Sequence, residues 1–195
     1  MLKIIVKRGG NCMKQFVVNI FGGPDAGKTT NMLLVAGWMK RQRVKVEFSD
    51  EWIKSKVYEK SPYPFKDQIY TFAKQRKKLI ERLDEKRLNV VITDSPLLLS
   101  AVYLGQPDAL FEELIVREFN STNNINIYLE RPEEREYDPV GRLQDEDGAK
   151  EVDFVIKQYL DDKQIPYHVI RSEEGSEEVI YELIMKYIAE AREVA

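Results

Sequence analysis

The sequence predicts an α/β fold built on a parallel β-sheet, and three observations support this class. Short runs rich in β-branched residues alternate with longer segments whose apolar residues recur at helical spacing, as βαβ units require. The strand-like runs are apolar without clean alternation, which is typical of strands covered on both faces. No internal repeat, low-complexity tract or Gly/Ser-rich linker divides the chain, so a single domain is expected.

Five strands and five helices are expected from these patterns. The strands are predicted, in chain order, at 15–21, 43–48, 89–94, 123–129 and 166–171. The helices are predicted at 28–41, 66–87, 107–119, 146–162 and 176–192. The last helix is the best marked, because Ser176 precedes two acidic residues of a first turn and apolar residues then recur at helical spacing. The single histidine, His168, falls in the last predicted strand and is expected to be buried.

Length and composition are those of one globular domain. The 195 residues are 43% hydrophobic and 32% charged, and the formal net charge of −3 gives no overall attraction to nucleic acid. No apolar run is long enough to cross a bilayer, so no membrane association is expected. The single cysteine, Cys12, excludes an internal disulfide and a thiolate zinc cluster, and we therefore expect a cytoplasmic protein.

Residues 1–12 are expected to be an N-terminal extension of a domain that spans 13–195. Their apolar stretch has only four residues and no small-residue cleavage site follows it, so they do not resemble a signal peptide. Met13 runs directly into the first predicted strand, and both Met1 and Met13 stay open as the native start.

A glycine-rich segment follows the first strand and opens the first helix. Its sequence, Gly22-Gly23-Pro24-Asp25-Ala26-Gly27-Lys28-Thr29, matches the motif G-x-x-x-x-G-K-[ST] in the strand–helix context that this motif requires. Backbone N–H groups of such a turn and the N-terminus of the following helix attract phosphate oxygens. We call residues 22–29 the phosphate loop. The predicted nucleotide contacts are Gly22, Gly23, Asp25, Ala26, Gly27, Lys28, Thr29 and Thr30.

Two side chains of the phosphate loop and one carboxylate predict the chemistry of this site. Lys28 supplies charge for the β- and γ-phosphates of ATP, and the Thr29 hydroxyl is a ligand for Mg²⁺. Asp94 ends the apolar run at 89–94, where a carboxylate faces the phosphates as a metal ligand or as a general base. A turn residue or helix cap is the alternative interpretation of Asp94.

The charge-rich segment at 130–148 is a candidate for a cationic lid. It follows the fourth predicted strand and contains Arg131, Arg135 and Arg142. A kinase needs cations over the phosphoryl group that it transfers, and Arg142 is the first candidate for this role. For each of these arginines, a solvated surface position is the alternative.

The phosphate acceptor is expected beyond the second strand, at the same edge of the sheet. Asp50 and Glu51 close that strand, and a carboxylate there suits the removal of a proton from a hydroxyl or the binding of a ribose. Helix capping is the alternative for Asp50. Gln75 is a candidate for contacting a base edge or a solvated residue, and the basic run at 74–78 is a nucleic-acid contact or a wet helix face.

Four stretches of the chain resemble the small P-loop kinases related to the nicotinamide riboside kinase domain of NadR and to phage-encoded P-loop kinases. In chain order they are FGGPDAGKTT, VEFSDE, NVVITDSPLLLSAVY and YDPVGRLQDEDGAKEVDFVIKQYL. The resemblance covers nearly the whole chain from Met13. It implies a three-layer P-loop NTPase sandwich with a five-stranded parallel sheet in the order 2-3-1-4-5, ATP with Mg²⁺, and a small lid at about 130–148. The matching residues are Gly22, Gly27, Lys28 and Thr29 in the phosphate loop, Asp94 at the strand end and Arg142 in the lid.

These features predict a kinase that moves the γ-phosphate of Mg·ATP to a hydroxyl of a nucleoside-like small molecule. The candidate catalytic residues are Lys28, Asp94, Arg142, Asp50 and Glu51. One alternative is a DNA kinase that acts on a hydroxymethylated pyrimidine or a strand end, for which the basic run at 74–78 is the support. The other is a non-catalytic nucleotide-dependent switch, which needs neither an acceptor-side carboxylate nor an arginine lid. The sequence predicts no particular acceptor and no oligomeric state.

Overall fold

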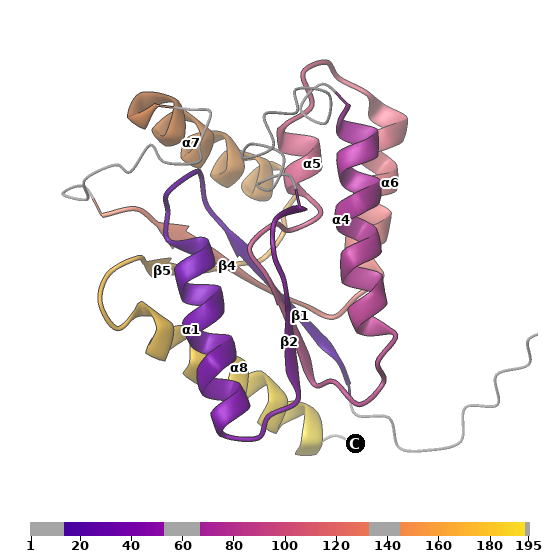
Figure 1. The fold of residues 1–195 in the computed structure, drawn as a ribbon. Helices are drawn as coiled ribbons and strands as arrows, with labels where there is room; N and C mark the ends of the chain where they lie inside the picture. Colours follow the sequence, from indigo (N-terminus) through magenta and orange to yellow (C-terminus); the bar gives the residue numbers. More distant parts are fainter. Residues whose placement is uncertain (1–13, 53–66, 133–144, 194–195) are drawn as a thin grey trace, which may run out of the picture.

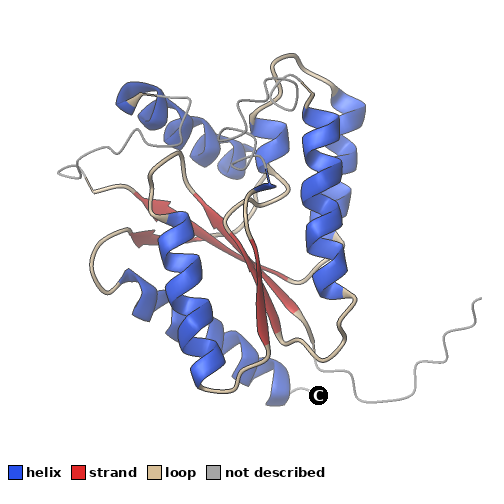
Figure 2. Cartoon of the chain, viewed as in Figure 1, coloured by secondary structure: helices blue, strands red, loops and turns tan. Residues whose placement is uncertain are grey.

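A computed structural model describes residues 14–52, 67–132 and 145–193 of the chain. Within these residues, five strands form one parallel sheet in the order β2-β3-β1-β4-β5. Figure 1 shows that helices cover both faces of this sheet, and Figure 2 shows the same three layers by secondary structure. The α/β class and the strand order are therefore confirmed. The N-terminal extension at 1–12 lies outside the described residues.

All ten predicted elements are present; α1 and α7 have the predicted bounds, and the ends of the other eight are shifted. The strands are β1 (Phe16–Phe21), β2 (Val46–Ser49), β3 (Val90–Thr93), β4 (Asn124–Glu130) and β5 (His168–Arg171). The helices are α1 (Lys28–Arg41), α4 (Gln68–Leu83), α5 (Leu99–Val102), α6 (Ala109–Asn120), α7 (Glu146–Asp162) and α8 (Ser176–Glu193). Helix α5 was not predicted, because four residues inside an apolar run show no helical period. Among the described helices, none combines the length and apolarity that a membrane span requires.

Aspartates begin three of these helices. The side chains of Asp67, Asp108 and Asp145 accept hydrogen bonds from backbone N–H groups three residues further on. An acceptor at this position satisfies a donor that has no partner within the helix, and replacing it by alanine typically costs about 1 kcal/mol. Local sequence therefore fixes where α4, α6 and α7 start.

The apolar residues form one core layer on each face of the sheet. Because side chains alternate along a strand, β1 supplies Val18 and Ile20 to one layer and Val17 and Phe21 to the other. The first layer is completed by α1 and α8, and the second by α4, α6 and α7. Every residue of β1 is buried, and the strand ends directly in the phosphate loop.

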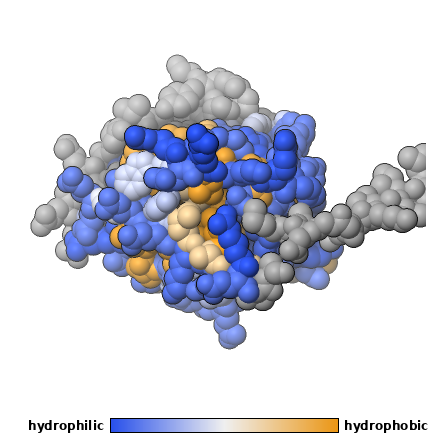
Figure 3. Space-filling view, turned by 90° about the horizontal axis from the view of Figure 1, so that it is seen from below, coloured by the Kyte–Doolittle hydropathy of each residue, from blue (hydrophilic) through white to orange (hydrophobic). Residues whose placement is uncertain are grey.

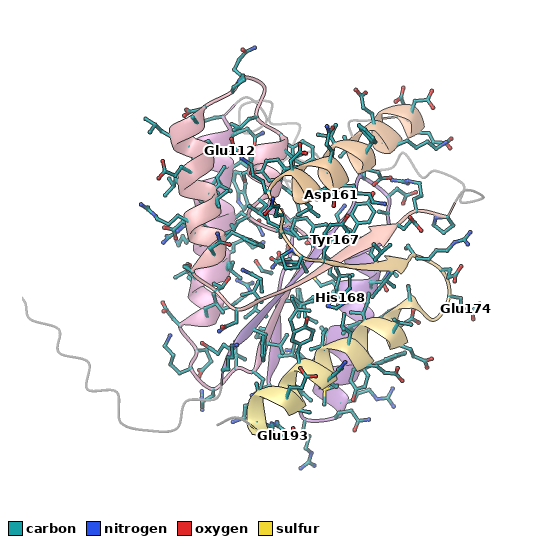
Figure 4. The ribbon with its side chains drawn as sticks, turned by 180° about the vertical axis from the view of Figure 1, so that it is seen from behind. Glu112, Asp161, Tyr167, His168, Glu174 and Glu193 are labelled. Atoms are coloured by element: carbon teal, nitrogen blue, oxygen red, sulfur yellow. The ribbon has the colours of Figure 1, made fainter. Side chains whose placement is uncertain are left out.

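Strand β5 forms an open edge of the sheet (Figure 4). His168 is exposed, and its Nε2 lies 3.0 Å from the hydroxyl oxygen of Tyr187. The expectation that His168 is buried is wrong, because an edge strand is covered less fully and only Ile170 of β5 is buried. Next to the strand, the Tyr167 hydroxyl donates to Oδ1 of Asp161 at 2.7 Å and so ties the edge to the end of α7.

Candidate nucleotide-binding and active site

The backbone of the phosphate loop has conformations that favour glycine. Gly22 has a φ of 143° and Gly27, at the N-cap of α1, has a φ of 88°. A Cβ added at Gly22 would lie 2.9 Å from the Cβ of Ala26 and 3.2 Å from the carbonyl oxygen of Leu129. The two glycines that the motif specifies are therefore required by the path of the chain, which turns from β1 into α1.

The side chain of Lys28 folds back over the phosphate loop. Its Nζ donates to the carbonyl oxygen of Gly23 at 2.7 Å. Burial lowers the pKa of Lys28, while Glu51, Asp94 and Asp153 oppose this shift by favouring the charged ammonium. A half-buried ammonium in this position is suited to attract an anion that lies on the loop.

Thr29 and Asp94 meet beside the phosphate loop. β1 and β3 are neighbours in the sheet, so the residue that follows β3 lies next to the start of α1. The Thr29 hydroxyl donates to Oδ2 of Asp94 at 2.6 Å, and Asp94 is buried. Mg²⁺ prefers oxygen ligands and is usually bound through one or two protein groups together with substrate phosphates. This hydroxyl and carboxylate fit that requirement.

Asp50, directly after β2, is held by α4. Nζ of Lys78 donates to Oδ1 of Asp50 at 2.7 Å and to its backbone carbonyl oxygen at 2.9 Å. Partial burial alone would raise the pKa of Asp50, but the hydrogen bond and the charge of Lys78 outweigh it and hold this pKa below its ordinary value. The Asp50 carboxylate is thus paired and only weakly basic.

Gln75 of α4 is buried and binds the backbone that leaves β2. Its Oε1 accepts from the backbone N–H of Trp52 at 3.1 Å, and its Nε2 donates to the carbonyl oxygen of Asp50 at 3.4 Å. Arg82 of the same helix donates to the carbonyl oxygen of Phe48 at 2.5 Å. Gln75 therefore positions residues 49–52, which differs from both the base-reading and the solvated interpretation.

The basic run at 74–78 is largely occupied by contacts within the chain. Arg76 pairs with Glu118 at 2.7 Å, Lys77 with Glu81 at 3.4 Å, and Lys78 with Asp50. Lys74 lies over the ring of Tyr70, 5.2 Å from its centroid. These contacts leave the run less cationic than its sequence indicates.

Glu51, two residues after the end of β2, lies within electrostatic range of Lys28. Of the carboxylates that favour the charged form of Lys28, Glu51 has the largest effect. Burial raises the pKa of Tyr103, and the negative charges of Glu51 and Asp153 raise it further. Glu51 is therefore the carboxylate that links the exit of β2 to the phosphate loop.

Of the remaining predicted site residues, the structure describes three in or next to the phosphate loop and does not describe two arginines of the segment at 130–148. Asp25 has a φ of 63°, and Ala26, whose backbone N–H donates to the carbonyl oxygen of Gly23 at 3.3 Å, is buried. Thr30 is exposed in the first turn of α1. Arg135 and Arg142 lie outside the described residues.

Asp153 of α7 contacts the phosphate loop and was missed by the sequence analysis. Its Oδ1 accepts from the backbone N–H of Gly23, and its Oδ2 accepts from Nε of Arg131 at 2.9 Å. Arg131 also donates to the carbonyl oxygen of Pro24. A signal was present: Asp153 falls at helical spacing among Ala149, Ile156 and Leu160, the buried residues of α7.

A separate hollow lies at the amino-terminal ends of the strands. Figure 3 views the molecule from below, toward this end of the sheet. The hollow measures about 350 Å³ and lies among the residues that precede β2 and β3, including Lys40, Lys45 and Arg87. Since the phosphate loop follows the carboxyl end of β1 and the sheet is parallel, this hollow is not part of the candidate site.

Known structures share this fold. A thymidylate kinase from Ehrlichia chaffeensis matches with a TM-score of 0.58 and 13% identity over 90% of this chain and 99% of that kinase. A NadR protein in complex with NR matches with a TM-score of 0.66 and 15% identity over 90% of this chain, which spans 51% of the NadR chain. At these identities the likeness shows the fold alone.

Sequence comparison identifies the family. No curated protein sequence is similar enough to match the chain. A family model described as an AAA domain matches residues 17–178, which include the phosphate loop, Asp94 and Asp153. This match covers most of the chain, and the protein therefore belongs to the AAA domain family of P-loop proteins.

Proposed function

We propose that the protein is a kinase that transfers the γ-phosphate of Mg·ATP to a hydroxyl of a nucleoside-like small molecule. One observation carries the proposal: Lys28, Thr29 and Asp94 meet at the carboxyl edge of the sheet, with Glu51 in electrostatic range of Lys28. A nucleotide switch needs the first three residues. A switch does not need a carboxylate on the acceptor side, whereas such a group can take the proton of a hydroxyl that attacks the phosphate.

The phosphate loop and its neighbours have distinct proposed roles. Backbone N–H groups of residues 22–30 bind phosphate oxygens, and the Lys28 ammonium stabilises charge on the β- and γ-phosphates. Thr29 and Asp94 would hold Mg²⁺, which supplies charge neutralisation on the phosphates when bound with the nucleotide. Arg142, in the segment at 130–148, is proposed to contact the transferred phosphoryl group.

Glu51 is the proposed proton acceptor of the reaction. Asp50 is paired with Lys78, and its lowered pKa makes it a poor base. Asp94 accepts the Thr29 hydroxyl on the metal side of the site. Glu51 precedes Trp52, whose backbone Gln75 holds, and this contact favours a fixed position for its carboxylate near the attacking hydroxyl.

A small acceptor is favoured over DNA. The similar structures are a thymidylate kinase and a NadR protein bound to NR, and both names favour a nucleoside-like acceptor. The basic run at 74–78, which supported the DNA alternative, is engaged with Asp50, Glu81 and Glu118. A DNA acceptor is therefore an outcome to be tested rather than the leading proposal.

A transfer assay with γ-labelled Mg·ATP tests the proposal. The acceptors are free nucleosides, nicotinamide riboside, nucleoside monophosphates and DNA that contains hydroxymethylpyrimidines, and the readout is labelled product. We expect label in a free nucleoside or a nucleotide. Product from DNA alone would replace our proposal with the DNA kinase. Saturable ATP binding without product from any acceptor would favour the switch.

A further inference from the structure

We propose that Asp153 is a positioning residue which, paired with Arg131, fixes the phosphate loop and through it Lys28. This inference rests on the proposed function, because it concerns the nucleotide that Lys28 would contact. It also assigns a role to an acidic residue of α7 that lies outside the sequence motif.

The contacts of this pair reach two consecutive residues of the phosphate loop. Asp153 accepts from the backbone N–H of Gly23 at 2.5 Å and from Nε of Arg131 at 2.9 Å, while Arg131 donates to the carbonyl oxygen of Pro24. The side chains of Arg131 and Asp153 are only 9% and 13% exposed. Charge-assisted hydrogen bonds at this degree of burial hold their partners in a defined geometry.

Gly23 connects this pair to Lys28. Its N–H donates to Asp153, and its carbonyl oxygen accepts from Nζ of Lys28 at 2.7 Å. The two contacts lie on consecutive peptide units of the same residue, so a displacement of Gly23 would move the carbonyl oxygen that accepts from Lys28. The charges of the pair also reach Lys28: Asp153 favours the charged form of the lysine, and Arg131 opposes it.

The packing of α7 against Gly23 supports a built contact. A Cβ at Gly23 would lie 2.6 Å from Oδ1 of Asp153 and 2.7 Å from the carbonyl oxygen of Ala149. Position 23 is unspecified in the phosphate-loop motif. The glycine at this position is therefore explained by the close approach of α7, which leaves no room for a side chain. From β4, the Tyr128 hydroxyl donates to the carbonyl oxygen of Asp153 at 3.1 Å and so holds the helix backbone.

The test measures Mg·ATP affinity by titration calorimetry in Asp153→Asn, Arg131→Met and the double variant. The two carboxylate oxygens of Asp153 each accept from a different donor, so Asp153→Asn replaces one acceptor by an NH₂ group that faces the N–H of Gly23 or the Nε–H of Arg131. Loss of a hydrogen bond to a charged group predicts a Kd about tenfold higher. The double variant should bind Mg·ATP no more weakly than the weaker-binding single variant, because the residues act as one unit.

Asp162→Asn, which changes an exposed aspartate of α7, is the matched control and should leave the Kd for Mg·ATP unchanged.

A second readout separates positioning from mere stabilisation. We expect the KM for ATP to rise in Asp153→Asn while the KM for the acceptor stays within about twofold, since the acceptor binds on the other side of Lys28. Thermal unfolding monitored by circular dichroism defines the temperature at which each variant is folded. A variant that loses melting temperature but binds Mg·ATP like the wild type would overturn the inference, as would additive losses in the double variant.

The outcomes also separate this inference from the proposed function. If the wild-type protein fails to bind Mg·ATP, the proposed function is contradicted at its first step. If the wild type binds and Asp153→Asn binds equally well, only the role of Asp153 is contradicted. If Asp153→Asn does not fold, Arg131→Lys provides the test. This variant keeps the positive charge but loses the planar guanidinium that contacts both Asp153 and Pro24, so its affinity for Mg·ATP should fall severalfold. Unchanged affinity in Arg131→Lys would then overturn the inference.

Discussion

The phosphate loop and the exit of β2 lie at the same edge of the sheet, but they are built differently. The phosphate loop depends on the local chain, since Gly22 and Gly27 permit its turns and Lys28 binds back to it. The exit of β2 depends on a distant helix, because Gln75 and Lys78 of α4 hold its backbone and one of its carboxylates. The proposed nucleotide side is thus encoded in one short segment, whereas the proposed acceptor side is assembled by contacts that are remote in sequence.

The largest expected effect is on the nucleotide side. Lys28→Ala should lower kcat by about 10³-fold, because in our proposal the ammonium stabilises charge that develops during transfer. Lys40→Ala is the matched control on α1, since this lysine pairs with Glu47 and lines the hollow at the amino-terminal ends of the strands. Steady-state kinetics measure both variants. Near-normal turnover in Lys28→Ala would exclude the proposed role.

Arg142→Ala tests the lid that we propose for the segment at 130–148. A contact that strengthens in the transition state predicts a kcat about 10²-fold lower, with little change in the KM for either substrate. An effect confined to the KM for the acceptor would instead assign Arg142 to substrate binding.

On the acceptor side, the two adjacent carboxylates should differ. Glu51→Gln should lower kcat by about 10²-fold, the usual scale for loss of a general base, with ATP affinity retained. Asp50→Asn should lower it by less than about tenfold, because this carboxylate is paired with Lys78. The reverse order of effects, measured under saturating ATP, would exchange the two assignments.

Gln75→Ala should separate the two sides. The change leaves the N–H of Trp52 without its Gln75 contact and is expected to cost about 1–3 kcal/mol of unfolding free energy. We also expect a higher KM for the acceptor and an unchanged Kd for Mg·ATP. Lys77→Ala, an exposed position on the same helix, is the control. Equal losses of ATP and acceptor affinity would show that α4 supports both sides.

The smallest effect concerns pH. The pKa of Asp50 in the folded protein lies below its ordinary value of 3.8, so its stabilising contribution is present above that value and is lost as pH falls through the folded pKa. Because Asp50 is about half exposed, the contribution is less than about 1 kcal/mol. Denaturant unfolding of the wild type and Lys78→Met should show a difference that shrinks at acid pH. A difference that grows as the pH falls would contradict this pairing.

The contrast between the two sides also explains what the sequence could predict. The strands, the helices and the roles predicted for Lys28, Thr29 and Asp94 follow from local patterns, since apolar runs and a glycine motif report on nearby backbone. The strand order was predicted from the resemblance to small P-loop kinases, because local patterns do not report which strands are neighbours. The pairing of Asp50 with Lys78 and the backbone contacts of Gln75 depend on how α4 packs beside β2. Asp153 is one of many acidic residues in its region, and only its place among buried residues of α7 distinguishes it.

The most direct test of the central claim is a single-turnover assay with γ-labelled Mg·ATP and a pool of nucleosides. The account predicts that the label moves from ATP into a nucleoside or nucleotide fraction, and that this transfer is lost in Lys28→Ala. Label that stays in bound ATP, or that appears only as inorganic phosphate in the presence of every acceptor, would contradict the assignment of this site as a kinase.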